Sequence, residues 1–181
     1  MNRMLSFTII TLLTVWIISC KKSSSTPGST ITATINGVNK NFNLMAKALK
    51  GTSGGVTEIV ISGNNSNSST SSQTLQFTLD NSFSGDSITT GTYTDTSSTI
   101  NLTGLFAINA PGNDSIYEGG STVYENALYD SVTIIKHLTV TIISFSETAI
   151  TGTFSGDLFP FGNDAATPIS LTNGTFNVRF E

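Results

Sequence analysis

Apolar and polar residues alternate one by one through the last third of the chain. An alternation with a period of two residues places the apolar side chains on one face of a β-strand and the polar ones on the other. The polar partners are mostly threonines, as expected for antiparallel strands with one face in water. The apolar positions fall into three groups: Leu138, Val140 and Ile142; Ile150, Phe154 and Leu158; and Phe176, Val178 and Phe180.

The same alternation, broken by turn residues, runs through the preceding hundred or so positions. Its apolar groups are Ile31, Ala33 and Ile35; Ile59 and Ile61; Leu75, Phe77 and Leu79; and Ile100, Leu102, Phe106 and Ile108. Asn36-Gly37 follows the first group and is typical of a two-residue hairpin turn. Ser146-Glu147-Thr148 and Asn173-Gly174 predict further turns, and the polar run 63–72 predicts a loop.

These patterns predict an all-β fold. No long segment shows the 3.6-residue apolar period of a helix, although Ala46 to Lys50 is compatible with one helical turn. About nine or ten short strands separated by turns favour an antiparallel β-sandwich, with a small β-barrel as the alternative. Phenylalanines at inward positions (Phe77, Phe106, Phe154, Phe176 and Phe180) predict a filled core rather than a ligand cavity inside a barrel.

A Gly-Thr-aromatic tripeptide occurs three times, as Gly91-Thr92-Tyr93, Gly152-Thr153-Phe154 and Gly174-Thr175-Phe176. Glycine permits a bend or bulge, threonine suits the wet face of a sheet, and the aromatic residue fills the core. The repetition therefore has a structural explanation, with internal duplication as the alternative.

The N-terminus has the features of an export signal. Arg3 supplies a positive charge, and Met4 to Ile18 form an uncharged run of about 15 residues, which suits a signal peptide better than a membrane-spanning helix of roughly 20. The following Ser19-Cys20 completes a sequence that resembles the lipobox of bacterial lipoproteins. This resemblance implies cleavage after Ser19 and acylation of Cys20, and several acyl chains anchor a protein stably to a bilayer. The alternative is an ordinary signal peptide followed by an unrelated cysteine.

The predicted organisation is a signal peptide at 1–19, an acylated cysteine with a flexible tether at 20–29, and a single β-sandwich domain at 30–181. The tether contains serine, threonine, proline and glycine and cannot bury a core. Lipoproteins exported to the surface of Bacteroidota commonly carry acidic residues after the cysteine, whereas Lys21-Lys22 stands here. We therefore expect a lipoprotein of the outer membrane, with its periplasmic face favoured over surface exposure.

Three stretches resemble a group of small Bacteroidota lipoproteins of uncharacterised function. They are residues 32–37, residues 150–156 (Ile-Thr-Gly-Thr-Phe-Ser-Gly) and residues 171–178 (Leu-Thr-Asn-Gly-Thr-Phe-Asn-Val), taken together with the lipobox. The resemblance implies an all-β lipoprotein. Its motifs are turns and strand starts, so it carries over no catalytic or binding residue.

Charge and composition exclude several classes of function. Charged residues make up 11% of the chain and the formal net charge is −4, which disfavours nucleic acid as a partner. Phosphate-binding loops and dinucleotide fingerprints are absent, so no cofactor is expected. With one cysteine in the chain, stability must come from packing rather than from disulfides.

Three of the four tyrosines fall in the segment 113–131. Tyr117, Tyr124 and Tyr129 stand beside acidic residues, among them Glu118. Tyrosine offers a rigid, amphipathic contact surface, and long loops on a rigid sandwich commonly carry binding sites. The segment is therefore a candidate recognition surface for a glycan or an envelope protein, the alternative being a hairpin with half-buried tyrosines.

Other candidate residues have weaker sequence support. Ser53 stands in Gly-Thr-Ser-Gly-Gly, which matches the G-x-S-x-G pattern of hydrolases, but a strand rather than a helix is expected after it. His137, the single histidine, has no visible partner for zinc binding or for general-base catalysis. Asp114 and Asp164 lie in turns without the spacing of a calcium loop. The sequence thus favours a membrane-anchored, non-catalytic binding or structural module, with a small hydrolase or carbohydrate-active enzyme as the alternative.

Overall fold

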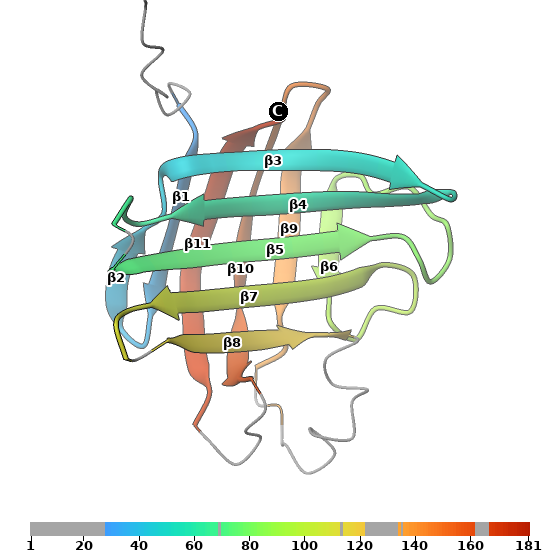
Figure 1. The fold of residues 1–181 in the computed structure, drawn as a ribbon. Coiled ribbons are helices and arrows are strands. Elements are labelled where there is room, and N and C mark those ends of the chain that lie inside the picture. The colour runs from blue at the N-terminus through green and yellow to red at the C-terminus, as the bar shows by residue number, and fades with distance from the viewer. Residues whose placement is uncertain (1–27, 69, 113, 122–133, 135, 162–166) are drawn as a thin grey trace, which may run out of the picture.

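The computed structural model describes residues 28–68, 70–112, 114–121, 134, 136–161 and 167–181 (Figure 1). The named elements are eleven β-strands: β1 (Thr30–Ile35), β2 (Val38–Asn41), β3 (Leu44–Ser53), β4 (Val56–Asn64), β5 (Ser72–Asp80), β6 (Gly91–Thr94), β7 (Asn101–Asn109), β8 (Ser115–Gly120), β9 (Thr139–Phe145), β10 (Ala149–Pro160) and β11 (Ile169–Arg179).

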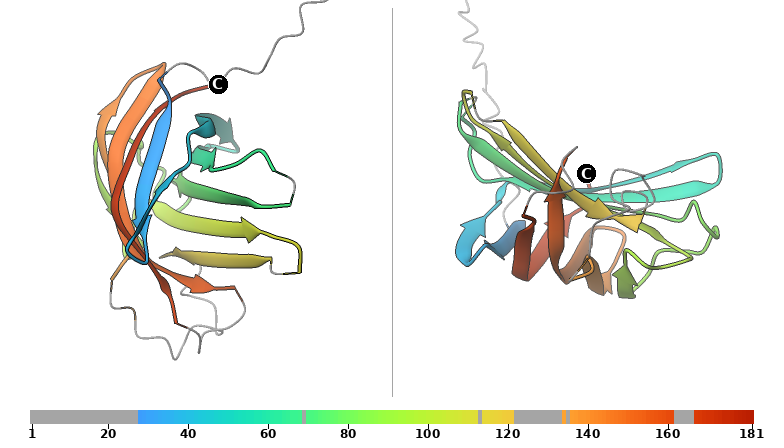
Figure 2. Two further views of the ribbon diagram at one scale, coloured as in Figure 1. Left: turned by 90° about the vertical axis from the view of Figure 1, so that its left-hand side faces the viewer. Right: turned by 90° about the horizontal axis from the view of Figure 1, so that it is seen from below.

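The strands form two layers that face each other (Figure 2). Sheet A has the order β6-β9-β10-β11-β1-β2, and sheet B has the order β3-β4-β5-β7-β8. All of these pairings are antiparallel, and the strands of the two sheets cross steeply in Figure 1. This crossed arrangement confirms the predicted all-β, antiparallel fold, in which a curled sheet packs against itself as in a sandwich or a small barrel.

β10 connects the two sheets because it is long enough to belong to both. Its first part pairs with β9 and β11 in sheet A, whereas Phe159 and Pro160 at its end pair with Glu118 and Tyr117 of β8 in sheet B. At the opposite side the chain terminus closes the gap between the sheets, since the backbone amide of Glu181 donates to the carbonyl of Ala48 in β3 (3.1 Å).

The inward side chains of both sheets form one core. Phe77 of sheet B and Phe154 of sheet A meet across the layers with ring centroids 4.4 Å apart. Phe77, Phe106, Phe154 and Phe176 are all buried, as the alternation predicts, while Phe180 is half-buried against Phe145. Their burial confirms the prediction of a core filled by aromatic side chains.

Two local predictions are wrong. The segment 46–50 lies within β3 and is not a helical turn, because Ala46 and Ala48 alternate with outward residues and enter the core. Asn173-Gly174 is not a turn between strands but lies inside β11, where Asn173 has a φ of +52° and the pairing with β10 shifts register. A β-bulge uses the same left-handed conformation as a turn, so the dipeptide alone does not distinguish them.

Other turn predictions are confirmed. Asn36 and Gly37 have φ values of +48° and +80° and connect β1 to β2, the pair of positive angles that a two-residue hairpin turn requires. Residues 146–148 connect β9 to β10, with the amide of Ser146 donating to the carbonyl of Ala149 (2.9 Å). The described residues form eleven strands rather than nine or ten. The sequence pattern did not reveal β6 and β8, because both are short and show no clear alternation.

Candidate functional site

The predicted tyrosine segment begins in β8. Tyr117 lies opposite Phe106 of β7 on one side and Pro160 of β10 on the other, so it stands where the two sheets meet. Its ring is half-buried at the margin of the core, with its centroid 6.1 Å from that of Phe106. Tyr124 and Tyr129 lie outside the described residues.

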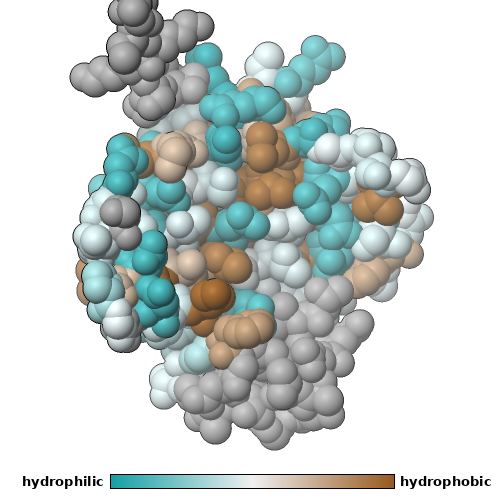
Figure 3. Space-filling view, in the orientation of Figure 1, coloured by the Kyte–Doolittle hydropathy of each residue, from teal (hydrophilic) through white to brown (hydrophobic). Residues whose placement is uncertain are grey.

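A hollow of about 420 Å³ opens beside Tyr117 at this corner. Its lining residues are Asp114, Ser115, Ile116, Tyr117, Pro160 and Phe161. Phe161 is 66% exposed and Ile116 is 46% exposed, so two large apolar side chains of the same hollow face solvent. In Figure 3, apolar residues reach the lower part of the sheet B face and lie beside hydrophilic residues. We call these six residues the corner hollow.

Backbone contacts hold the corner hollow in place. The amide of Phe161 donates to the carbonyl of Ile116 (2.8 Å), which extends the β8–β10 pairing by one more bond. Oδ1 of Asp114 accepts from the amide of Ala110 (3.0 Å) and closes the turn before β8. The hollow therefore combines a fixed apolar wall with a carboxylate at its rim. Glu118 is half-buried in β8 and does not line the hollow.

Sequence reasoning missed Phe161. The signal for it is the run Leu158-Phe159-Pro160-Phe161, in which the strict alternation of β10 ends in consecutive apolar residues. Leu158 and Phe159 are buried, so Phe161 is the one aromatic side chain of this run that faces solvent.

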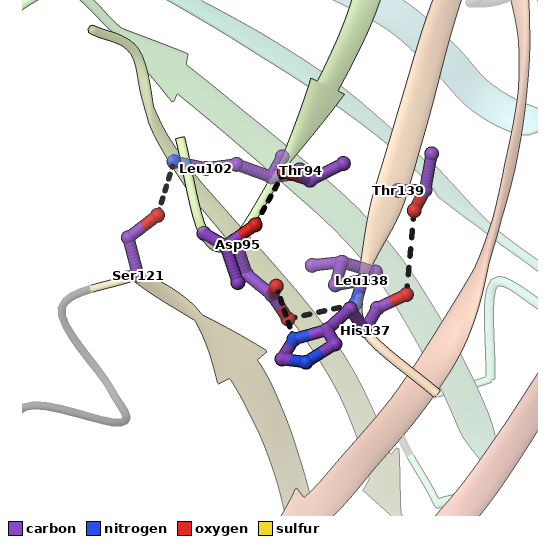
Figure 4. A network of polar contacts seen from close by, with 8 residues as sticks. Thr94, Asp95, Leu102, Ser121, His137, Leu138 and Thr139 are labelled. Atoms are coloured by element: carbon purple, nitrogen blue, oxygen red, sulfur yellow. Dashed lines mark hydrogen bonds and ion pairs between the residues drawn. The ribbon is translucent and has the colours of Figure 1, made fainter. Parts of the chain in front are cut away.

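A second arrangement surrounds His137 (Figure 4). Its Nδ1 lies 2.7 Å from Oδ1 of Asp95, and the amide of Leu138 donates to Oδ2 of the same carboxylate (2.7 Å). The Asp95 side chain is fully buried, whereas the His137 side chain is 46% exposed. Asp95 is thus the orienting partner for His137 that the sequence did not reveal, because 42 positions separate the two residues.

An imidazole held at Nδ1 by a carboxylate is suited to ligate a metal or to accept a proton through Nε2. The hydroxyl of Ser121, drawn in the same view, accepts a hydrogen bond from the backbone amide of Leu102 (3.4 Å; Figure 4). Also within the described part of the chain, no group of three or more His, Cys, Asp or Glu side chains lies close enough together to hold a metal ion.

Ser53 ends β3 and is exposed, and the glycines after it turn the chain into β4. Gly54 and Gly55 have φ values of +59° and +86°. Ser53 thus lies in a strand–turn–strand hairpin, not in the strand–turn–helix of a nucleophile elbow.

Cys20 precedes the described residues. Within those residues, no helix has both the length and the apolar character needed to cross a membrane. Comparisons of the chain with protein-family models, with curated proteins and with solved structures each gave no match.

Proposed function

We propose that this protein is a membrane-tethered, non-catalytic binding module of the cell envelope, anchored through acylated Cys20. The observation that supports this proposal best is the exposure of Phe161 and Ile116 around the corner hollow. Adjacent exposed apolar side chains at a concave site favour burial against a partner.

The arrangement of the strands supports display of this site away from a membrane. Thr30 begins β1 opposite Asn177, near the end of β11. In Figure 1, β1 begins at the upper end of the molecule. The corner hollow lies at the other end of β10. The stretch of β10 from Thr151 to Pro160 separates the two levels by nine residue-to-residue steps, which corresponds to roughly 30 Å. A tether that joins the domain at Thr30 would therefore place the hollow at the end of the domain that is farther from the membrane.

The chemistry of the hollow favours a protein partner over a glycan. Ile116 is a branched aliphatic side chain, which packs well against apolar side chains, and Asp114 can accept hydrogen bonds from a donor at the rim. A pocket of about 420 Å³ suits one or two large side chains of a partner. We expect the partner to place an apolar residue in the hollow and a donor group beside Asp114.

We predict that Ile116→Thr combined with Phe161→Ser weakens capture of the envelope partner at least tenfold, because the apolar contact is lost. Full-length protein with an affinity tag, solubilised in detergent, would be used in pull-downs from envelope extract and on a glycan array. Ile143→Thr is the matched control, because Ile143 is 63% exposed on sheet A. Equal capture by the double variant and this control would refute the proposal. The proposal would also be refuted if a glycan were the only ligand whose binding the double variant loses.

The Asp95–His137 pair supports a second candidate, a small hydrolase in which His137 acts as the base. A panel of ester and glycoside substrates tests this function. Turnover that is lost in His137→Gln would establish it, and turnover that persists in this variant would exclude this role for His137.

A further inference from the structure

The outward face of sheet A carries an uninterrupted row of uncharged polar residues across all six strands. In the strand order β6-β9-β10-β11-β1-β2, the row consists of Thr92, Thr141, Thr153, Thr175, Thr32 and Asn41, each directly opposite the next. Five of these six positions are threonine. All six side chains are exposed or half-buried, because no other element covers this face in the described structure.

Four of the five threonine hydroxyl groups in this row are hydrogen-bonded in pairs. The hydroxyls of Thr32 and Thr175 are 2.9 Å apart, and those of Thr92 and Thr141 are 3.0 Å apart. In the neighbouring row, the hydroxyl of Thr34 donates to Oδ1 of Asn39 (2.7 Å). Side chains fixed in this way lose little conformational freedom when they bind, which favours association.

Two hollows follow these rows and share one residue. The first, of about 580 Å³, lies over β9, β10 and β11, and the second, of about 330 Å³, lies over β1 and β2. Asn173 lines both, because the bulge in β11 gives it a φ of +52° and an exposed position between them. The two hollows therefore adjoin at Asn173 and together extend over five strands, and we call the pair the furrow.

The lining of the furrow determines which ligand chemistry fits. Of the residues that line the two hollows, Lys40 alone carries a charge, and its ammonium group donates to Gln73 (2.9 Å). Threonine hydroxyls both donate and accept hydrogen bonds, and their methyl groups offer small apolar contacts between them. A chain of sugar rings presents hydroxyls and C–H groups in the same alternation, whereas an anionic polymer would require cations.

The twist of the sheet excludes a rigid, flat ligand. Neighbouring strands of a sheet typically rotate by about 20–25° relative to each other, so a row across six strands turns by about 100–125°. A flexible chain molecule can follow this path, while a flat crystalline surface can contact two or three strands at most. With strands about 4.8 Å apart, the furrow extends over about 19 Å, enough for several sugar units.

We propose that the furrow on sheet A binds a neutral polysaccharide that runs across the strands. The site is separate from the corner hollow, which lies on β8 and the end of β10. Binding of polysaccharide and binding of the envelope partner should therefore be lost in different variants.

The test is affinity electrophoresis of the detergent-solubilised full chain in gels that contain dextran, mannan, laminarin, xylan or galactan, with anionic alginate as the charged comparison. We expect retardation by at least one neutral polymer and none by alginate. The triple variant Thr141→Val, Thr153→Val and Thr175→Val should weaken retardation at least tenfold. Valine preserves shape and strand preference, so the variant should fold, which circular dichroism would verify.

The matched control is Thr78→Val with Thr103→Val, which removes two outward hydroxyls from sheet B and should leave retardation unchanged. Asn173→Gly removes the side chain shared by the two hollows and relaxes the backbone there, so it should weaken binding without loss of stability. Failure of every neutral polymer to retard the wild-type protein would overturn the proposal, and so would equal retardation of the triple variant and the sheet B control. Phe161→Ser should not affect retardation.

Discussion

At the scale of residues, the repeated Gly-Thr-aromatic tripeptide has a reciprocal role. Gly152 lies opposite Phe176, and Phe154 lies opposite Gly174, in the pairing of β10 with β11. A Cβ atom at either glycine would lie under 3.0 Å from the ring of the facing phenylalanine. Each glycine therefore makes room for the aromatic ring of the other tripeptide, so cross-strand packing accounts for two of the three tripeptides. Gly91 of the third lies opposite Ile142.

We predict that Gly152→Ala lowers the free energy of unfolding by about 2 kcal/mol, because the added methyl group would meet both the Phe176 ring and the carbonyl of Thr141. Chemical denaturation monitored by fluorescence or circular dichroism measures the change. Gly51→Ala is the control, since no atom lies within 4 Å of a Cβ at that position. Equal stability of the two variants would contradict the packing role.

At the scale of elements, Asp95 and His137 fasten the end of β6 to the beginning of β9. The last paired residues are Thr94 and Thr139, and the amide of Asp95 then donates to the carbonyl of Leu138 (3.0 Å). The return bond from the amide of Leu138 goes to the carboxylate of Asp95 rather than to its backbone carbonyl. The buried side chain thus continues the ladder by one step and orients His137 as well.

We predict that Asp95→Ala destabilises the protein by about 2–3 kcal/mol, because it leaves the buried amide of Leu138 without an acceptor. His137→Ala should lower the free energy of unfolding by a smaller amount. Water can replace the half-exposed ring, and the amide of Leu138 keeps its hydrogen bond to Asp95. Asp86→Ala, at an exposed position, should change stability by less than about 0.5 kcal/mol. A double-mutant cycle on thermal or urea unfolding measures the coupling of Asp95 and His137. Zero coupling would argue against their hydrogen bond in solution.

At the scale of the whole molecule, the two ends of sheet A are suited to different tasks. β1 begins beside the C-terminal end of β11, and the corner hollow lies at the far end of β10. A tether of ten residues spans at most about 36 Å when extended. Under the proposed anchoring at Cys20, the sandwich would therefore stay within a few nanometres of the membrane.

We predict that Cys20→Ala releases the protein from the membrane fraction without unfolding the sandwich. Acyl chains on Cys20 are the proposed anchor, and no residue of 30–181 is required for it. Fractionation of cells followed by immunoblotting measures the distribution, with Ser23→Ala as the control. Retention of the alanine variant in the membrane fraction would show that another contact holds the protein there.

The sequence by itself indicated the all-β class, most of the strands with their buried faces, and several of the turns. Alternation depends on neighbours two positions apart, and the Asn36-Gly37 turn on two backbone angles, so both are visible locally. The segment 46–50 was ambiguous because alanine favours helix in isolation, and packing of Ala46 and Ala48 against the core made it a strand.

Only the tertiary structure decided which distant residues share a site. Asp95 meets His137 across 42 positions, Phe161 joins Tyr117 where two sheets meet, and Thr32 aligns with Thr175 across 143 positions. Strand order and register depend on the packing of the whole core and on loop closure over long distances, so local patterns cannot specify them. The threonines were assigned to wet faces from sequence, but their row and furrow arise from the order of six strands.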